Sequence, residues 1–565
     1  MGSTTELVPT VTDGPLTGAP DGPMPDARSP DAKSPNSTKP DAKMATRTDA
    51  DRPAANIRAD EWGPFGRPLF DDPTARALSR VGVVDVGSNS VRMVVFDGAA
   101  RSPAYFFNEK VMSGLGSGLA ETGRLNPVGR SRALAALKRF ALLAEGMHMA
   151  PLTVVATAAV REASDGAEFR EEVLRETGLR MFVIDGAEEA RLSAQGVLLG
   201  WPDAEGLVCD IGGSSMELAV IGKGQVGKRV TSPLGPFRLQ RIGGGPGALK
   251  AHISGILTRL KSELGGRQER IYLVGGSWRA IARLDMERKA YPLTVLHEYR
   301  MTPKSVLETV DWIAGNDLTD LRLRTGTGIE RMELVPLACE VLRHLVRVFK
   351  PREIDVSSYG IREGMLYEQM PERLRRRDPL IEACRNAEYS AARIPGFGKK
   401  LFEFLLPLYK WTPPERLRLI KAACLLHDVS WRAHPDYRDE ASFDNATRAN
   451  LGALDHPGRV FLGLALLHRY RNSRSGSRLE PLFKLLTPGE IQDAEILGKA
   501  MRFGAMFAID SPREAGELYY YPKKRVLELV LQPQKQGLFG EVAAARFASL
   551  ASSMQVATRV RVARH

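Results

Sequence analysis

The feature that most restricts the possible folds is a pair of similar segments 125 residues apart. The first reads VVDVGSNSVRMVVF (83–96) and the second reads VCDIGGSSMELAVI (208–221). In each, an apolar run ends at an Asp-(Val/Ile)-Gly turn rich in Ser or Asn, and a second apolar run follows. One such segment alone predicts only a β-hairpin with a glycine turn. Two copies at this spacing predict a duplicated α/β domain whose two turns face one cleft.

The rest of the chain fits this organisation. LTVVATAAV (152–160) and RIYLVGGSWRAIARLDM (270–286) read as strands that lead into helices, and such alternation is typical of α/β layering. We expect one domain over 76–204 and a second over 205–375. Segments such as PERLRLIKAACLLHDV predict a third, helical domain over 376–565. Residues 1–75 hold 12 of the 36 prolines and predict a disordered extension.

Charge and cysteine placement limit the class of protein. Residues 371–565 hold 32 Lys and Arg against 21 Asp and Glu, which favours a polyanionic partner, with a solvated basic surface as the alternative. No basic run is dense or interleaved with aromatics, so no specific nucleic-acid partner is expected. The four scattered cysteines predict reduced, mostly buried thiols. No apolar run reaches the roughly 18 residues of a membrane span, and the N-terminus has no signal-peptide pattern. We therefore expect a cytoplasmic protein without a membrane partner.

The two turns carry the residues of a phosphate site. Glycine lets the backbone approach an anion, and consecutive N–H groups form a nest for phosphate oxygens. The predicted phosphate-binding residues are Gly87, Ser88, Asn89 and Ser90 in the first turn and Gly212, Gly213, Ser214 and Ser215 in the second. A carboxylate at the end of each strand would repel phosphate, so Asp85 and Asp210 are better suited to a divalent cation or its water shell. Turn capping is the alternative for both.

Six segments in order carry a resemblance to a known family. They are DVGSNSVRM (85–93), ATAAVREASDGAEF (156–169), GAEEARL (186–192), DIGGSSMEL (210–218), VGGSWRAIARL (274–284) and SSYGIREGMLY (357–367). Together they resemble the exopolyphosphatase/guanosine pentaphosphate phosphatase (Ppx/GppA) family of the actin, Hsp70 and sugar-kinase superfamily, over about residues 80–370. The resemblance implies two actin-like (ribonuclease H-like) domains and a C-terminal all-α HD-like domain. Ser214 and Met216 depart from the family pattern, which usually has Gly and Thr there.

The resemblance also implies roles for individual residues. Glu189 corresponds to the catalytic glutamate that activates water, and Asp210 and Glu217 join it as catalytic residues. Asp85, Asp210 and Glu217 would hold Mg²⁺. Arg161 would contact phosphate, as would Arg92 with less support, although either could form a structural ion pair. Without the other motifs, Glu188 and Glu189 would be explained by a helix N-terminus.

Two further segments complete the expected site. Gly275 and Gly276 open a helix in a turn that lies near a nucleotide elsewhere in the superfamily, and a tight helix-entry turn is the alternative. In the tail, His427-Asp428 is the pair of an HD phosphohydrolase. Such a site needs an earlier His, which the segment NAEYSAARIPGFG lacks. We therefore expect a degenerate metal site in a domain that serves substrate length or dimerisation.

The leading hypothesis is an exopolyphosphatase that uses Mg²⁺ and removes terminal orthophosphate from inorganic polyphosphate. A guanosine pentaphosphate (pppGpp) 5'-phosphohydrolase is the first alternative, because the same turns and glutamate would serve it. A non-catalytic polyphosphate or nucleotide sensor is the second alternative. A kinase would need an Asp base and an acceptor site that the sequence does not offer. The sequence leaves a homodimer open.

Overall fold

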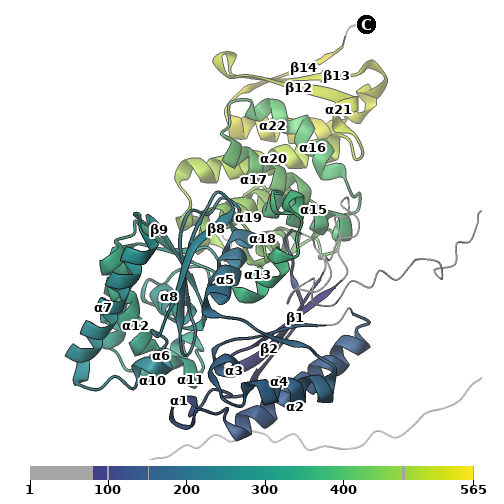
Figure 1. Cartoon of the computed structure of the whole chain (residues 1–565). Helices are drawn as coiled ribbons and strands as arrows, with labels where there is room; N and C mark the ends of the chain where they lie inside the picture. Colours follow the sequence, from purple (N-terminus) through teal and green to yellow (C-terminus); the bar gives the residue numbers. More distant parts are fainter. Residues whose placement is uncertain (1–79, 98–100, 150–151, 474–477, 564–565) are drawn as a thin grey trace, which may run out of the picture. The chain divides into compact units, whose positions relative to one another are not determined.

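The structure is a computed structural model that describes residues 80–97, 101–149, 152–473 and 478–563. The extension predicted to be disordered, 1–75, lies outside the described residues. Within the described part, two β-sheets lie in the first two-thirds of the chain, and helices dominate the rest (Figure 1).

The first sheet has five strands in the order β3-β2-β1-β4-β5. The antiparallel pairs β1–β2 and β2–β3 form its hairpin side, and β4 and β5 add in parallel beyond β1. Strand β1 is apolar and buried on both faces, as expected for a strand in the middle of a covered sheet. The strands are β1 (Val81–Val86), β2 (Ser90–Phe96), β3 (Tyr105–Met112), β4 (Thr153–Ala156) and β5 (Met181–Val183).

The second sheet repeats this arrangement. Its order is β10-β11-β9-β6-β7-β8, with β6–β7–β8 antiparallel and β9 and β11 parallel to β6. Only the antiparallel edge strand β10 has no counterpart in the first sheet. The predicted duplicated α/β architecture is therefore confirmed, while the domain boundaries stay predictions. The strands are β6 (Gly206–Ile211), β7 (Met216–Gly222), β8 (Gln225–Ser232), β9 (Arg270–Val274), β10 (Tyr299–Met301) and β11 (Glu353–Val356).

Helices cover both sheets, and two of them, α5 and α13, lie side by side with very close backbones (Figure 1). A Cβ atom at Gly364 of α13 would lie 1.8 Å from the carbonyl oxygen of Leu192 in α5, so no larger residue fits. The helices of this part are α1 (Leu119–Thr122), α2 (Pro127–Gly146), α3 (Ala158–Glu162), α4 (Gly166–Thr177), α5 (Gly186–Gly200), α6 (Pro236–Leu239), α7 (Gly245–Leu264), α8 (Gly276–Arg288), α9 (Pro303–Ala314), α10 (Leu318–Thr325), α11 (Ile329–Met332), α12 (Val335–Phe349), α13 (Ile361–Glu368) and α14 (Glu372–Arg375).

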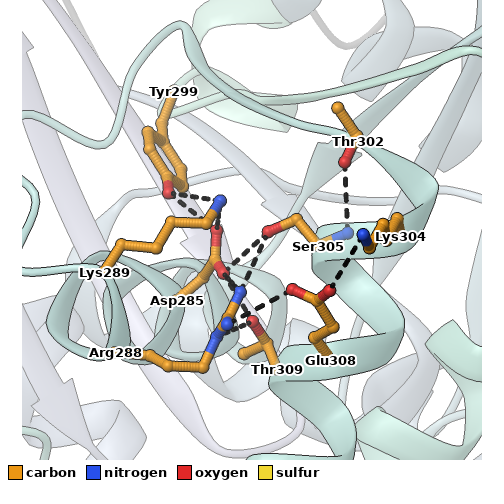
Figure 2. A network of polar contacts seen from close by, with 9 residues as sticks. All are labelled: Asp285, Arg288, Lys289, Tyr299, Thr302, Lys304, Ser305, Glu308 and Thr309. Atoms are coloured by element: carbon orange, nitrogen blue, oxygen red, sulfur yellow. Dashed lines mark hydrogen bonds and ion pairs between the residues drawn. The ribbon is translucent and has the colours of Figure 1, made fainter.

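A buried carboxylate joins α8, α9 and β10. Figure 2 shows Asp285 accepting hydrogen bonds from Tyr299 Oη at 2.7 Å, from Ser305 Oγ at 2.9 Å and from Lys289 Nζ at 2.8 Å. Burial alone would raise the pKa of Asp285, but the hydrogen bonds from Lys289, Thr309 and Tyr299 lower it below its usual value. All its partners lie on these three elements or next to them, so we assign Asp285 a structural role in holding α8, the helix that follows the Gly275-Gly276 turn.

The C-terminal part is largely helical, but the expectation of an all-α domain is wrong. Strands β12 (Gly516–Tyr521), β13 (Val526–Leu531) and β14 (Ala557–Val562) form a third sheet at the end of the chain, beside α22 (Figure 1). Strand β14 pairs in parallel with β13, and α22 makes the crossover that this pairing needs. The other helices are α15 (Pro379–Ala391), α16 (Phe397–Leu405), η3 (Leu406–Tyr409), α17 (Pro414–Leu426), α18 (Arg438–Arg448), α19 (His456–Tyr470), η4 (Glu480–Leu485), α20 (Pro488–Phe507), α21 (Pro512–Ala515), η5 (Pro522–Lys524), η6 (Pro533–Leu538) and α22 (Glu541–Met554).

Two simpler expectations can be checked against the same residues. Cys209, Cys339, Cys384 and Cys424 are all free and buried, as predicted. Among the residues that the structure describes, no helix combines the length and the apolar character needed to cross a membrane.

Candidate active site

The two predicted turns have the same backbone geometry. The N–H of Gly87 donates to the carbonyl oxygen of Ser90 at 3.0 Å, and the N–H of Gly212 donates to that of Ser215 at 2.9 Å. The strand register is also equivalent, since Asp85 lies opposite Arg92 and Asp210 lies opposite Glu217. The similarity read from the sequence is thus a similarity of structure.

The first turn is braced by the segment that follows β3. The carbonyl of Ser88 accepts from the N–H of Gly116 at 2.7 Å, and that of Asn89 accepts from Ser113 and Gly114 at 3.1 and 3.0 Å. These carbonyls are therefore held against residues 113–116. A turn whose carbonyls are engaged in this way is suited to offer its N–H groups to an anion.

At several glycines around the second turn, a side chain would collide with neighbouring residues. A Cβ atom at Gly213 would lie 2.7 Å from the ring of Phe237, and one at Gly235 would lie 2.3 Å from the backbone of Ser214. Gly275 has a φ of +114°, and its Cβ would lie 2.6 Å from the carbonyl oxygen of Ile211 and 3.1 Å from Asp210 Oδ1. The Gly275-Gly276 turn is therefore packed directly against the end of strand β6.

Four carboxylates gather beside these turns. Burial raises the pKa of Glu189 well above its usual value, and the negative charges of Glu217 and Asp210 raise it further. Burial also raises the pKa of Glu217 to about 8 and raises that of Asp210. Burial raises the pKa of Asp85 as well, against the opposing effect of Arg362. The group is a concentration of buried carboxyl groups with raised pKa values, of the kind found at functional sites.

Three of the four carboxylates are held by hydrogen bonds. Ser193, one turn after Glu189 on α5, donates to Asp210 Oδ2. Thr231 Oγ1 donates to Glu217 Oε1 at 3.0 Å, and Arg362 Nη1 donates to Asp85 Oδ2 at 3.2 Å.

Glu189 differs from the other three. Its Oε2 atom is buried without a hydrogen-bond partner among the described residues. Arg161 Nη1, at 3.7 Å, forms only an ion pair with it and donates its hydrogen bond to the carbonyl of Ile184 at 2.7 Å. The neighbouring Glu188 behaves differently, because it forms a 2.6 Å ion pair with Arg191. Helix α5 therefore holds a buried carboxylate oxygen that accepts no hydrogen bond from the described residues.

A group of cations lies close to the carboxylates, and most of it was not assigned from sequence. Burial lowers the pKa of Arg279 to about 10, and the charges of Arg362 and Arg331 lower it further. The pKa of Lys110 is lowered by burial and then by Arg331 and Arg92. These five side chains, which we call the cleft cations, are Arg92, Lys110, Arg279, Arg331 and Arg362.

The structure thus places Asp85, Glu189, Asp210 and Glu217 within electrostatic reach of one another and packs Gly275 against Asp210. The sequence did not predict Ser193 and Thr231, which donate hydrogen bonds to the carboxylates, or the cleft cations other than Arg92. Ser193 could have been predicted from its spacing, because it lies four residues after Glu189 and therefore on the same helix face. Arg279 and Arg362 stand inside the motifs SWRAIARL and GIREGML but had no assigned role. The catalytic, phosphate and metal roles themselves stay predictions.

The described residues contain no group of three or more His, Cys, Asp or Glu side chains placed to hold a metal ion. In the tail, Asp428 accepts bidentate hydrogen bonds from Arg393 at 2.6 and 2.8 Å. His427 Nδ1 lies 2.9 Å from the carbonyl of Cys424. The His-Asp pair is thus engaged with protein groups.

Comparisons with known proteins agree with the motifs. A sequence model described as "Ppx/GppA phosphatase family" matches residues 94–373, and one described as "Exopolyphosphatase, C-terminal" matches 410–559. Exopolyphosphatase 1 of Mycobacterium leprae is 25% identical over 308 residues, which cover 52% of this chain and 89% of that protein. Retrograde regulation protein 2 of Saccharomyces cerevisiae is 25% identical over 451 residues, covering 71% of this chain and 74% of that protein. The crystal structure of the Aquifex aeolicus Ppx/GppA family member is 25% identical, with a TM-score of 0.46, and covers 52% of this chain and 97% of that one.

Proposed function

The chain belongs to the Ppx/GppA phosphatase family, and we propose that it is an exopolyphosphatase, which hydrolyses terminal orthophosphate from inorganic polyphosphate. Relatives named exopolyphosphatase support a phosphatase acting on phosphate chains. The observation that carries the proposal within this chain is the buried, unbonded Oε2 atom of Glu189 beside two phosphate-type turns.

We assign Glu189 the role of general base. Hydrolysis of a phosphoanhydride needs a water aligned with the terminal phosphorus and a group that takes its proton. The Oε2 atom of Glu189 has no protein donor, so it is available to accept a proton from such a water. The N–H groups of the two turns other than those of Gly87 and Gly212, which donate within the turns, would hold the phosphoryl oxygens. The water oxygen then bonds to phosphorus, and the shortened chain leaves as the P–O bond breaks.

Mg²⁺ is the cofactor that we propose. Mg²⁺ prefers hard oxygen ligands, keeps several waters and is often bound by one or two carboxylates and substrate phosphates. The described residues contain no group of three or more carboxylates placed to hold a metal ion by themselves, so water and substrate oxygens would have to complete its shell. Asp85, Asp210 and Glu217 would hold the ion directly or through water. Its contribution would be to neutralise charge on the transferring phosphoryl group.

The cleft cations favour a polyphosphate chain over a nucleotide. Arg331 places its guanidinium 3.1 Å from the position that a Cβ atom of Gly276 would occupy. A cation therefore lies directly against this turn. A continuous polyanion gains from several cations in succession, whereas a nucleoside offers them no charge.

The test is orthophosphate release with Mg²⁺ from long polyphosphate and from pppGpp, using the wild type, Glu189→Gln and Glu188→Gln. We expect release from polyphosphate, a loss of at least a hundredfold in kcat for Glu189→Gln, and near-normal kcat for the control Glu188→Gln, whose side chain pairs with Arg191, since general bases typically contribute about 10²–10⁴-fold. Faster release from pppGpp would select the alternative substrate. Binding without release from either substrate would identify a sensor and refute the proposal.

A further inference from the structure

A small cavity in the C-terminal part is lined by arginines. It has a volume of about 310 Å³ and lies where the ends of α17 and α19 meet α18 and α20. Arg393, Arg438, Arg469 and Arg502 line it, together with Asp428. The cavity shares no residue with the candidate active site, and it surrounds the His427-Asp428 pair that sequence reasoning singled out as a degenerate metal site.

The cavity carries an unbalanced positive charge. Asp428 is its one carboxylate, and both of its oxygens are already bonded to Arg393. The other three arginines form no ion pair among the described residues. Arg438 donates to the carbonyl of Ala433, and Arg502 donates to Asn472 Oδ1 at 2.9 Å. Both acceptors are neutral oxygens, so neither contact compensates the positive charge of the arginine.

Arg469 is the most constrained member. Its side chain is only 7% exposed, and its Nε atom is buried without a hydrogen-bond partner. Its guanidinium packs over the ring of Tyr470 at 4.9 Å, and the same ring faces Arg438 at 5.7 Å. A buried charge without a partner is costly, so this arrangement is expected where an anion completes it. Burial and then the charges of Arg546 and Arg469 lower the pKa of Arg502 to about 10, as expected for crowded cations.

The same features exclude a cation. His427 Nδ1 is directed to the carbonyl of Cys424, and the surrounding arginines repel metal ions. Guanidinium groups are planar, carry several donors and match the oxygens of phosphate. A volume near 300 Å³ is at the lower end of ligand pockets, which suits a small group.

We propose that this cavity is a second, non-catalytic site for a phosphate-class oxyanion. The ligand is either free orthophosphate or one phosphoryl group of a polyphosphate chain, because both present the same oxygens. The site stands independently of the proposed hydrolysis, since it rests on residues that the active site does not use.

The test is direct binding to the full-length protein. The ring of Trp431 lies 5.9 Å from the guanidinium of Arg393, so its fluorescence can report on this cavity, and the response that is lost on Trp431→Phe substitution isolates it from the other tryptophans. The probes are orthophosphate and, in a Glu189→Gln background that prevents hydrolysis, polyphosphate. The variants are Arg469→Gln and Arg502→Gln, and the control is Arg448→Gln, which changes an exposed arginine of α18 outside the cavity.

We expect both cavity variants to weaken the Trp431-reported binding about tenfold or more, and the control to leave it unchanged, because a hydrogen bond to a charged group is worth roughly 1.5–3 kcal/mol. A response to orthophosphate would make the site a product site, and a response to polyphosphate alone would make it a holder of the chain. If Arg469→Gln fails to fold, Arg502→Gln carries the test. Absence of any response to either probe, or a response that both variants retain, would overturn the proposal whether or not the protein is a hydrolase.

Discussion

At the scale of single residues, the neighbouring glycines Gly275 and Gly276 differ in what a side chain would contact at each position. Gly275 has a φ of +114° and packs against Ile211 and Asp210 Oδ1. At Gly276, a Cβ atom would meet only the guanidinium of Arg331, which is the mobile end of a long side chain. Replacement by alanine should therefore destabilise the fold at Gly275 and affect substrate binding at Gly276.

We predict that Gly275→Ala lowers the free energy of unfolding by at least about 2 kcal/mol, because it forces a strained φ and a backbone collision. Because Asp210 must also move, kcat should fall by about a hundredfold, the typical effect of a displacement of about 1 Å at an active site. Gly276→Ala should keep the stability and mainly raise KM. Thermal unfolding and steady-state kinetics measure both. Equal stability of the two variants would contradict the packing described here.

The residues of the site differ in the kind of sequence pattern that could predict them. Asp85, Asp210 and the glycines of both turns were found because a turn is a local feature that two copies repeat. Glu189 was found through the resemblance of the GAEEARL segment. Arg362 stands inside a motif, but its contact with Asp85 had no such signal, because the two residues are 277 residues apart. Nor did the hydrogen bond from Tyr105 to Glu363, over 258 residues. Contacts of this kind depend on how α13 packs against the first sheet, and no local pattern encodes that.

At the scale of elements, the two hairpins and the strand-to-helix units followed from apolar runs and glycine turns. The last three strands did not. ATRVRV alternates, but all of its side chains are exposed in β14, so no buried face marked it as a strand. Its pairing with β13 depends on the crossover helix α22, which the sequence shows only as one more amphipathic helix in a helical region.

A second element-scale feature is the contact between the segment before β10 and the segment before α19. Glu298 is buried there, and its Oε1 accepts a hydrogen bond from the N–H of Leu454 at 2.6 Å. Burial raises the pKa of Glu298 to about 8, although the hydrogen bond from Leu454 opposes the rise. In the folded protein this carboxyl is therefore protonated at neutral pH, whereas in the unfolded chain it ionises near its ordinary value of about 4.3.

The raised pKa of Glu298 makes the stability of the fold depend on pH. A raised pKa contributes stability that is complete below about pH 4.3, and this stability is lost as the pH rises through about 8. We predict that Glu298→Gln, which keeps the acceptor oxygen and cannot ionise, gains Tm relative to the wild type as the pH rises across this range. Thermal unfolding at several pH values measures it, with the exposed Glu287→Gln as control. A constant difference between Glu298→Gln and the wild type from pH 5 to pH 9 would contradict the assignment.

At the scale of the whole molecule, the net charge of +12 is concentrated in the C-terminal third, where 32 Lys and Arg face 21 Asp and Glu. The cleft cations add a second positive region next to the carboxylates. On the proposed function, a long phosphate chain bound at the cleft cations would also be attracted by the positive tail, whereas a short chain would meet the cleft cations alone. Long-range attraction of this kind raises association rates and weakens as salt screens it.

We therefore predict that raising the ionic strength lowers kcat/KM for long polyphosphate much more steeply than for tripolyphosphate. Replacing the exposed Lys523, Lys524 and Lys535 with Gln should raise KM for long chains several-fold and leave KM for tripolyphosphate unchanged, because only long chains reach the tail. Replacing Lys250 and Lys304, exposed lysines of the second α/β domain, provides the control. Equal losses on both substrates would mean that the tail acts on the fold or on the chemistry, and equal salt dependence would confine substrate binding to the cleft.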